Sequence, residues 1–296
     1  MKELVVISGK GGTGKTSIVS SFAALANPAV LADCDVDAAD LHLILDPTVV
    51  REENFSGGNR AEILQDRCTA CGLCHELCRF DAIIPNASAN GNPTYRVDPI
   101  ACEGCGVCAH FCPEQAIDFS PAVNGKWFVS DTRFGPMVHA KLGIAEENSG
   151  KLVAHVRTHA KQIAQEKQMD LILIDGPPGT GCPVIASITG ADLILAVTEP
   201  TLSGLHDLNR IFKLARHFDI PMLVCVNKWD LNPEITEKIE LQARNNQVGV
   251  CGRIRYDRSV TEAQLKVQSV IEHGNSPAAE DIMKVWEKVS GKIRQN

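Results

Sequence analysis

The chain has 296 residues, of which 44% are hydrophobic and 22% are charged. This is an ordinary globular composition with enough apolar material for a sizeable core. The formal net charge of -7 gives no electrostatic reason to expect nucleic acid as a partner. No segment approaches the roughly 18 uninterrupted apolar residues that a membrane span needs, and the first apolar stretch is too short for a signal peptide. We therefore expect a cytoplasmic protein that neither inserts into a membrane nor binds nucleic acid.

The chain opens with a predicted buried strand, Leu4–Ser8, and a glycine-rich loop that leads into a predicted helix, Lys15–Ala26. Between a strand and a helix, the pattern Gly-x4-Gly-Lys-Thr is typical of a phosphate-binding P-loop. Backbone N–H groups surround the phosphates, Lys15 reaches the terminal phosphates, and the Thr16 hydroxyl binds Mg²⁺. The predicted nucleotide-binding residues of this loop are Gly9, Lys10, Gly11, Gly12, Thr13, Gly14, Lys15, Thr16 and Ser17.

A second predicted strand, Ala29–Asp33, ends in a segment rich in aspartate. Carboxylates at the C-terminal edge of a parallel sheet lie where such folds perform their chemistry, and one carboxylate can orient or deprotonate an attacking water. We expect Asp33, Asp37 and Asp40 to be solvated or to cap a helix.

Eight of the twelve cysteines fall in two runs, each with the spacing Cys-x2-Cys-x2-Cys-x3-Cys. In a reducing compartment such a count indicates metal rather than disulfides. The surrounding segment has few core-forming residues and a turn-forming stretch, Pro85–Pro93, so we expect it to need metal to fold. We predict an inserted domain over residues 61–119, and one discontinuous P-loop domain over residues 1–60 and 120–296.

The spacing of these runs is typical of two-cluster bacterial ferredoxins, in which the fourth cysteine of each run binds the other cluster. Structural zinc is the competing interpretation, although it commonly uses two separated Cys-x2-Cys pairs. We predict two [4Fe-4S] clusters, close enough for electron hopping, within a small α+β ferredoxin domain. Cys68, Cys71, Cys74 and Cys112 are the predicted ligands of the first cluster, and Cys102, Cys105, Cys108 and Cys78 those of the second.

After the insert, apolar runs at Leu171–Asp175, Leu193–Val197 and Met222–Asn227 alternate with helical patterns. Nearly continuous apolar strands separated by helices imply a parallel sheet covered on both faces. The predicted fold class is therefore α/β, a doubly wound, mostly parallel and Rossmann-like P-loop sheet. Its core is expected to include Cys34, Cys225 and Cys251. A C-terminal helix with Ile282, Val285, Trp286, Val289 and Ile293 on one face is expected to dock on the sheet rather than on a membrane.

Lys10, directly after the first loop glycine, makes the P-loop resemble that of the MinD/ParA and nitrogenase-iron-protein class of P-loop ATPases. The resemblance implies a homodimer, or a heterodimer with a related ATPase, in which Lys10 reaches the partner's nucleotide. It also implies that Asp35 is the switch I aspartate, that Asp175 holds Mg²⁺ through water, and that Asn227 recognises the base. Lys10, Lys15 and Asp35 are thus the predicted catalytic residues, with ATP and Mg²⁺ as cofactors.

Two signals leave alternatives open. The sequence from Asn227 to Asp230 also fits the guanine-reading Asn-Lys-x-Asp motif, so GTP remains an alternative to ATP. Cys182, downstream of Asp175, resembles the cluster-binding cysteine of the nitrogenase iron protein. No second cysteine accompanies it, so it is either inert or has a transient cluster or redox role.

The resemblance covers the whole chain and implies an ATP-hydrolysing dimeric switch whose two clusters transfer electrons to a redox partner. One alternative is an iron–sulfur assembly or carrier ATPase of the Mrp type that serves a client protein, although the C-terminal Cys-x2-Cys of those carriers is absent. Another is a ParA/MinD-like positioning protein with structural or sensory clusters. The electron acceptor or client and the cluster potentials cannot be predicted from the sequence.

Overall fold

The structure is a computed structural model that describes residues 1–87, 93–143 and 149–295. The middle of the turn-forming stretch expected at Pro85–Pro93 therefore lies outside the described residues. The chain divides into two compact units, each described by itself below. One unit comprises Met1–Glu53, Trp127–Lys141 and Ser149–Asn296, and the other comprises Asn54–Lys126 and Leu142–Asn148.

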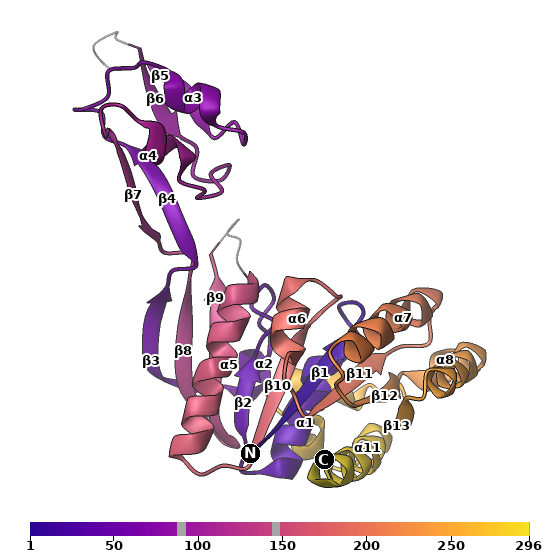
Figure 1. Ribbon diagram of the computed structural model, residues 1–296. Helices are drawn as coiled ribbons and strands as arrows, with labels where there is room; N and C mark the ends of the chain where they lie inside the picture. The colour runs from indigo at the N-terminus through magenta and orange to yellow at the C-terminus, as the bar shows by residue number, and fades with distance from the viewer. Residues whose placement is uncertain (88–92, 144–148, 296) are drawn as a thin grey trace. The chain divides into compact units, whose positions relative to one another are not determined.

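The first unit is built on a large, mostly parallel sheet (Figure 1). Among the described residues, nine strands follow the order β13-β12-β11-β1-β10-β2-β9-β8-β3, and every pair from β13 to β9 is parallel. The sheet confirms the predicted α/β class. The strands are β1 (Lys2–Ser8), β2 (Val30–Asp33), β3 (Thr48–Phe55), β8 (Gly125–Thr132), β9 (Gly135–Leu142), β10 (Leu171–Pro178), β11 (Leu193–Thr198), β12 (Met222–Asn227) and β13 (Gly249–Ile254).

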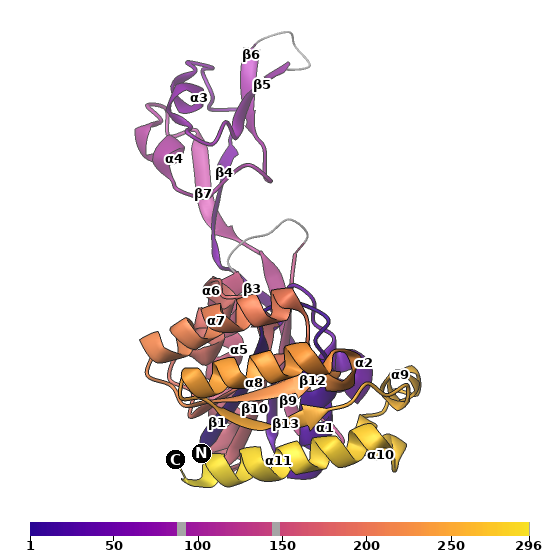
Figure 2. The ribbon, with the colours of Figure 1, turned by 90° about the vertical axis from the view of Figure 1, so that its right-hand side faces the viewer.

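Helices cover both faces of this sheet, as doubly wound folds require. One layer contains α1, α2, α10 and α11, and the other contains α5, α6, α7 and α8 (Figures 1 and 2). The helices are α1 (Lys15–Ala26), α2 (Leu41–Leu45), α5 (Ser149–Glu166), α6 (Cys182–Ile188), α7 (Leu202–His217), α8 (Pro233–Asn245), α9 (Ser259–Leu265), α10 (Val270–His273) and α11 (Pro277–Gln295), with a 3₁₀ turn η1 (Trp229–Leu231).

The C-terminal helix α11 packs into the main core. Its residues Ile282, Val285 and Val289 are buried in one cluster with residues of α1 and the central strands. Trp286 contacts the Phe22 ring at a centroid distance of 4.8 Å. This confirms the expected docking on the sheet. None of the described helices is long and apolar enough to cross a membrane.

The second unit contains two small antiparallel sheets and two short helices. Strand β4 pairs with β7, and β5 pairs with β6. Each helix follows the first two cysteines of one run, so the repeat in the sequence appears as a repeat in the structure. The elements come in the order β4 (Gly58–Ile63), α3 (Leu73–Leu77), β5 (Ile83–Ala87), β6 (Pro93–Val97), α4 (Val107–Phe111) and β7 (Ile117–Ala122).

Candidate functional site

The P-loop connects β1 to α1 and is braced by the end of β12. Gly14 has a φ of 88°, and a Cβ atom there would lie 2.5 Å from Nδ2 of Asn227, so only glycine fits. The same Nδ2 donates a hydrogen bond to the carbonyl of Thr13 at 2.8 Å. Asn227, the predicted base reader, therefore also supports the shape of the loop.

Three predicted residues gather at the C-terminal edge of the sheet beside this loop. Lys15 is buried, and its Nζ lies 4.0 Å from Oδ2 of Asp35. Asp175 is 1% exposed, and neither of its carboxylate oxygens has a hydrogen-bond partner among the described residues. A buried carboxylate without a partner is costly, and Mg²⁺ takes oxygen ligands. Asp175 and the neighbouring hydroxyl of Thr16 therefore fit a magnesium site.

An open cavity of about 1240 Å³ lies over the P-loop, lined by Lys15, Thr16, Asp35 and residues of α2 and α9. A second hollow of about 730 Å³ shares Gly12, Gly14 and Ser17 with it and extends to Asn227 and Tyr256. The two hollows adjoin along the P-loop and offer ample room for a nucleotide.

Helix α9 is a wall of this space that the sequence did not reveal. Gln264 lines both hollows, and its Nε2 donates to the Ser17 hydroxyl at 2.9 Å. The helix is short and carries no motif, so no local signal in the sequence could have placed it here.

Lys10 is held by Glu199, which follows β11. Its Nζ lies 2.5 Å from Oε1 of Glu199, while Lys228 Nζ lies 3.3 Å from the other oxygen and donates to the carbonyl of Gly12 at 3.1 Å. Although burial opposes it, these two lysines hold the pKa of Glu199 below its ordinary value. Glu199 was not predicted from the sequence. The pattern that identified Asp175, a carboxylate at the end of an apolar strand, would also have identified Glu199.

The remaining aspartates separate into structural and solvated groups. Asp33 is fully buried and accepts hydrogen bonds from the backbone N–H of Asp35 at 3.1 Å and of Leu41, the first residue of α2, at 3.2 Å. It therefore fixes the loop between β2 and α2. Asp37 and Asp40 are exposed, as expected. The carboxylate of Asp230 accepts from the backbone N–H of Tyr256 at 2.7 Å, which fixes the loop beside the base side of the cavity.

The stability of the nucleotide-free protein is expected to fall as the pH rises from about 5 to about 8. Burial, opposed by Lys15, raises the pKa of Asp175 to about 7 and that of Asp35 to about 6. In the unfolded chain both carboxyls titrate near pH 3.9, so unfolding releases protons, and the stabilisation present at low pH is lost as the pH passes the folded values. Asp175→Asn is expected to remove the part that Asp175 contributes, on the order of 2–4 kcal/mol at pH 8. Asp33, whose pKa burial also raises, keeps its own part. Thermal unfolding across this pH range measures the dependence of stability on pH. An Asp175→Asn variant with the same dependence as the wild type would contradict this prediction.

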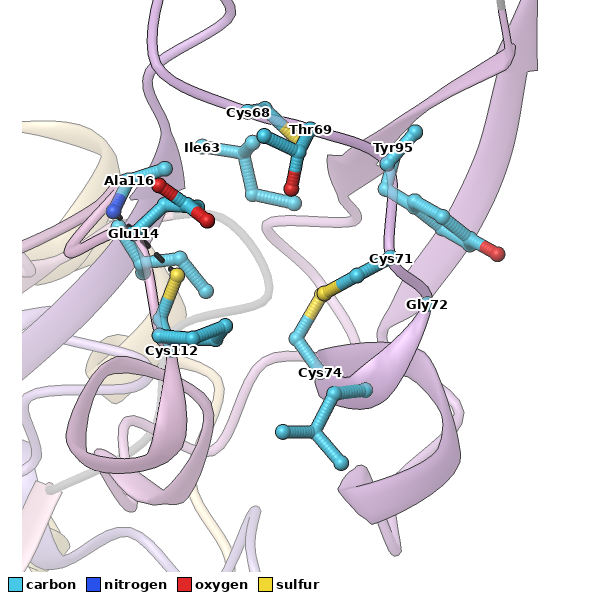
Figure 3. A pocket seen from close by; sticks show the side chains of 14 residues that line it. Ile63, Cys68, Thr69, Cys71, Gly72, Cys74, Tyr95, Cys112, Glu114 and Ala116 are labelled. Atoms are coloured by element: carbon cyan, nitrogen blue, oxygen red, sulfur yellow. Dashed lines mark hydrogen bonds between the residues drawn. The ribbon is translucent and has the colours of Figure 1, made fainter.

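The eight cysteines of the two runs line two separate hollows of the second unit. One, of about 350 Å³, is lined by Cys68, Cys71, Cys74 and Cys112. Figure 3 shows Cys112 on the opposite side of this hollow from Cys71 and Cys74. The other, of about 370 Å³, is lined by Cys78, Cys102, Cys105 and Cys108. These are the groupings that the spacing rule predicts, and their role as ligands remains a prediction.

The backbone around both hollows adopts the same unusual conformation. Positive φ angles recur at matching places: 58° and 80° at Ala70 and Gly72 beside the first hollow, and 61° and 75° at Gly104 and Gly106 beside the second. Such turns direct successive N–H groups into a concavity that binds anions, as in many iron–sulfur sites. The backbone and the four thiols of each hollow therefore fit an anionic, thiolate-bound cluster.

In the described part of the chain, no three His, Cys, Asp or Glu side chains converge closely enough to hold a single metal ion. Burial raises the pKa of the Cys74 and Cys108 thiols, whereas a metal ligand is a thiolate. All twelve cysteines are free. Cys34, Cys225 and Cys251 are buried, which confirms their expected packing role, and Cys182 is exposed at the start of α6.

Two curated relatives illustrate the comparison with known sequences. An uncharacterized protein of Methanocaldococcus jannaschii is 37% identical over 235 residues, which cover 78% of this chain and 79% of that protein. The iron-sulfur cluster carrier protein of Pyrococcus furiosus is 23% identical over 140 residues, which cover 43% of this chain and 48% of that protein. The second similarity is therefore partial.

The fold is similar to solved structures of MinD. The cell division ATPase MinD of Pyrococcus furiosus matches with a TM-score of 0.58 at 17% identity, covering 98% of each chain. The septum site-determining protein MinD of Pyrococcus horikoshii, complexed with Mg-ADP, matches with a TM-score of 0.57 at 17% identity, covering 97% of this chain and 95% of that one. The model of the CobQ/CobB/MinD/ParA nucleotide binding domain matches residues 4–270. The chain therefore belongs to this family as a P-loop ATPase of the MinD/ParA type.

Proposed function

We propose that the protein is an ATP-hydrolysing dimeric switch that carries two [4Fe-4S] clusters and couples its nucleotide state to electron transfer to a redox partner. The observation that carries the proposal is the composition of the two hollows. Each is lined by the first three cysteines of one run and the last cysteine of the other. The presence of a nucleotide cavity and two such hollows in one chain supports coupling between the nucleotide and the clusters.

The second unit is proposed to be a two-cluster ferredoxin domain centred on residues 61–119. Its element order from β4 to β7, β-α-β-β-α-β, is that of ferredoxin-like motifs. A single zinc ion would need four ligands converging at about 2.3 Å from the metal, whereas the described side chains hold no such group. The thiols line hollows instead, which supports a cluster of several atoms. Bound clusters would supply one-electron redox chemistry.

Around the nucleotide, each proposed residue has a task that its position supports. Lys15 neutralises the terminal phosphates from within the P-loop. Thr16 would hold Mg²⁺ directly and Asp175 would hold it through water, which would give the buried carboxylate a partner. Asp35, at the rim of the same cavity, accepts a hydrogen bond from the attacking water and orients it. The base lies toward Asn227, and we propose ATP because the Asp230 carboxylate is already engaged with the Tyr256 backbone.

The covalent path from the nucleotide site to the clusters is short. Asp33 holds the loop that carries Asp35 and the start of α2. Strand β3 follows α2, and the chain then enters the second unit at Asn54. A change in this loop on nucleotide binding would therefore act directly on the strand that leads to the cluster unit.

Replacing Lys10 by alanine is expected to prevent ATP-dependent dimerisation while leaving ATP binding by the monomer nearly intact. The Lys10 ammonium is held by Glu199 and lies within hydrogen-bonding distance of the Thr201 and Ser203 hydroxyls, rather than lining its own nucleotide cavity. We propose that it leaves Glu199 and completes the partner's site, so hydrolysis should fall about a hundredfold. Light scattering after size-exclusion chromatography measures the dimer. Lys238→Ala, which removes an exposed lysine on α8, is the control, and an ATP-dependent dimer of the Lys10 variant would contradict this role.

The function is tested anaerobically on protein with reconstituted and reduced clusters. Reoxidation by candidate acceptors is expected to require ATP turnover, with ADP and a non-hydrolysable analogue as controls. Equal reoxidation rates with and without nucleotide would contradict coupled electron transfer.

The partial similarity to an iron-sulfur cluster carrier protein supports a second candidate, an assembly or carrier ATPase. Iron that leaves this protein and appears in an apo-ferredoxin would favour that function. If ATP affects neither reoxidation nor iron transfer, a positioning protein with structural or sensory clusters remains.

A further inference from the structure

Arg133 lies in the two-residue turn between β8 and β9 and makes an unusually dense set of contacts. Its Nη1 donates to the carbonyl of Leu45 at 2.7 Å, and its Nη2 donates to the carbonyl of Ile44 at 2.9 Å. The same Nη2 lies 2.9 Å from Oε2 of Glu272 and 3.1 Å from the carbonyl of Val267, so its two hydrogens are shared among three acceptors, and Nε contacts the other oxygen of Glu272. One guanidinium therefore joins the end of α2 to the segment Val267–Glu272, which is distant from it in the sequence.

Both of these segments adjoin walls of the nucleotide cavity. Ile44 and Leu45 provide terminal carbonyls of α2, which have no partner within the helix. Ile44 itself lines the cavity, next to Leu43. Val267 follows Lys266, the C-cap of α9, and Gln264 of that helix also lines the cavity. Arg133 thus connects α2, which follows the Asp35 loop, to the end of α9, and both helices line the same cavity.

Arg133 donates to the carbonyl of a residue, Val267, whose backbone conformation is unfavourable. Val267 has a φ of 56°, which is a genuine outlier for a β-branched residue. Such strain persists only where the surrounding structure imposes it. The hydrogen bond from Arg133 to the Val267 carbonyl is one such constraint. Val267 N–H also donates to the carbonyl of Gln264 and Gln268 N–H to that of Ala263, both at 3.0 Å. These capping bonds and Arg133 together fix the end of α9.

The acidic partner of Arg133 is fixed as well. The Glu272 carboxylate also accepts hydrogen bonds from the N–H and hydroxyl of Ser269, in a capping box at the start of α10. Although burial opposes it, the hydrogen bonds from Arg133 and Ser269 hold the pKa of Glu272 below its ordinary value. The bidentate Arg133–Glu272 pair therefore has one rigid side, and its geometry is specific to arginine.

The hairpin that carries Arg133 is joined covalently to the cysteine-bearing part of the second unit through β8. Strand β8 begins at Gly125, where the chain leaves the segment Asn54–Lys126 of that unit. We propose that Arg133 is the positioning residue that transmits the nucleotide state from α2 and α9 to this hairpin, and so to the cluster unit. The proposal rests on the proposed function, because it concerns how nucleotide and clusters are coupled.

The test compares Arg133→Lys, which keeps the charge but loses the planar fork, with the wild type and with Arg216→Lys, an exposed arginine on α7. Two readouts are taken on the full chain with reconstituted clusters. Hydrogen exchange of Gly125–Leu142 with and without a non-hydrolysable ATP analogue reports the hairpin, and the reoxidation rate of the reduced clusters with and without ATP turnover reports the function. We expect nucleotide to change hairpin exchange about fivefold or more in the wild type and in Arg216→Lys. This response should be lost in Arg133→Lys even at nucleotide saturation.

Glu272→Gln supplies a second variant of the same contact. If Arg133 acts through Glu272, Glu272→Gln alone should lose the response as Arg133→Lys does. A purely structural role would lower the melting temperature without changing the ratio of exchange with and without nucleotide. An equal response in wild type and Arg133→Lys, or no hairpin response in the wild type, would overturn the proposal. A hairpin response that depends on Arg133 without any effect of nucleotide on reoxidation would keep the inference and overturn the proposed function.

Discussion

Replacing Cys68 and Cys112 together by alanine is expected to remove no more iron than replacing Cys68 alone. The two cysteines belong to different runs but line the same hollow. Loss of one thiolate is expected to prevent that site from binding its cluster. Loss of a second thiolate from the same site then removes no further iron. Both variants should therefore keep about four iron atoms per chain, against about eight in the wild type. Iron and sulfide analysis after anaerobic reconstitution measures this result.

The matched control pairs Cys68 with Cys78, its neighbour in the same run. Cys78 lines the other hollow, so the double alanine variant should lose both clusters and hold almost no iron. If instead the Cys68/Cys78 variant kept four irons and the Cys68/Cys112 variant lost all of them, each run would bind its own cluster. The proposed pairing would then be wrong.

Replacing Lys15 by alanine is expected to lower ATP hydrolysis by about a thousandfold. Lys15 is buried beside Asp35 at the start of α1, where few other cations can reach the terminal phosphates. Its loss removes the positive charge that stabilises the transferring phosphoryl group. It also removes the lysine that opposes burial in setting the pKa values of Asp35 and Asp175. Phosphate release at saturating Mg-ATP measures the rate.

Lys15→Met keeps much of the side-chain volume and separates lost charge from lost packing. Thermal unfolding of both variants shows whether the fold survives. Lys238→Ala on the exposed side of α8 should hydrolyse ATP as the wild type does. A folded Lys15 variant that hydrolyses ATP at the wild-type rate would contradict the role of the P-loop in hydrolysis.

The central sheet was predictable because its strands are buried on both faces. Helix α1 and strand β12 have the predicted bounds. Helix α1 begins at the P-loop, and β12 is a nearly continuous apolar run. Strands β3, β8, β9 and β13, which lie toward the two edges of the sheet, were not predicted. Strand β3 is exposed at every residue but the last, so it lacks the apolar pattern on which the other predictions depend.

At the site, residues with a local motif could be found and residues with only tertiary partners could not. The P-loop, Asp175 and the cysteine runs have spacing that reflects their chemistry. Gln264 and Arg133 reach the site across large sequence separations, and nothing local in the sequence distinguishes them from ordinary surface residues. Glu199 had a local signal, because it follows an apolar strand as Asp175 ends one. Asp33 was expected to be solvated or to cap a helix. It is fully buried instead, and its partners are the backbone N–H groups of Asp35 and Leu41.

The most direct test of the account is the affinity for a non-hydrolysable ATP analogue in the oxidised and in the reduced protein, measured anaerobically. If nucleotide changes the redox properties of the clusters, then thermodynamic linkage requires that cluster reduction change nucleotide affinity by the same factor. This test needs no knowledge of the electron acceptor. The account predicts dissociation constants that differ by about fivefold or more between the two redox states, with the difference lost in the Cys68/Cys78 variant. Equal dissociation constants in both redox states would contradict coupling between the nucleotide site and the clusters.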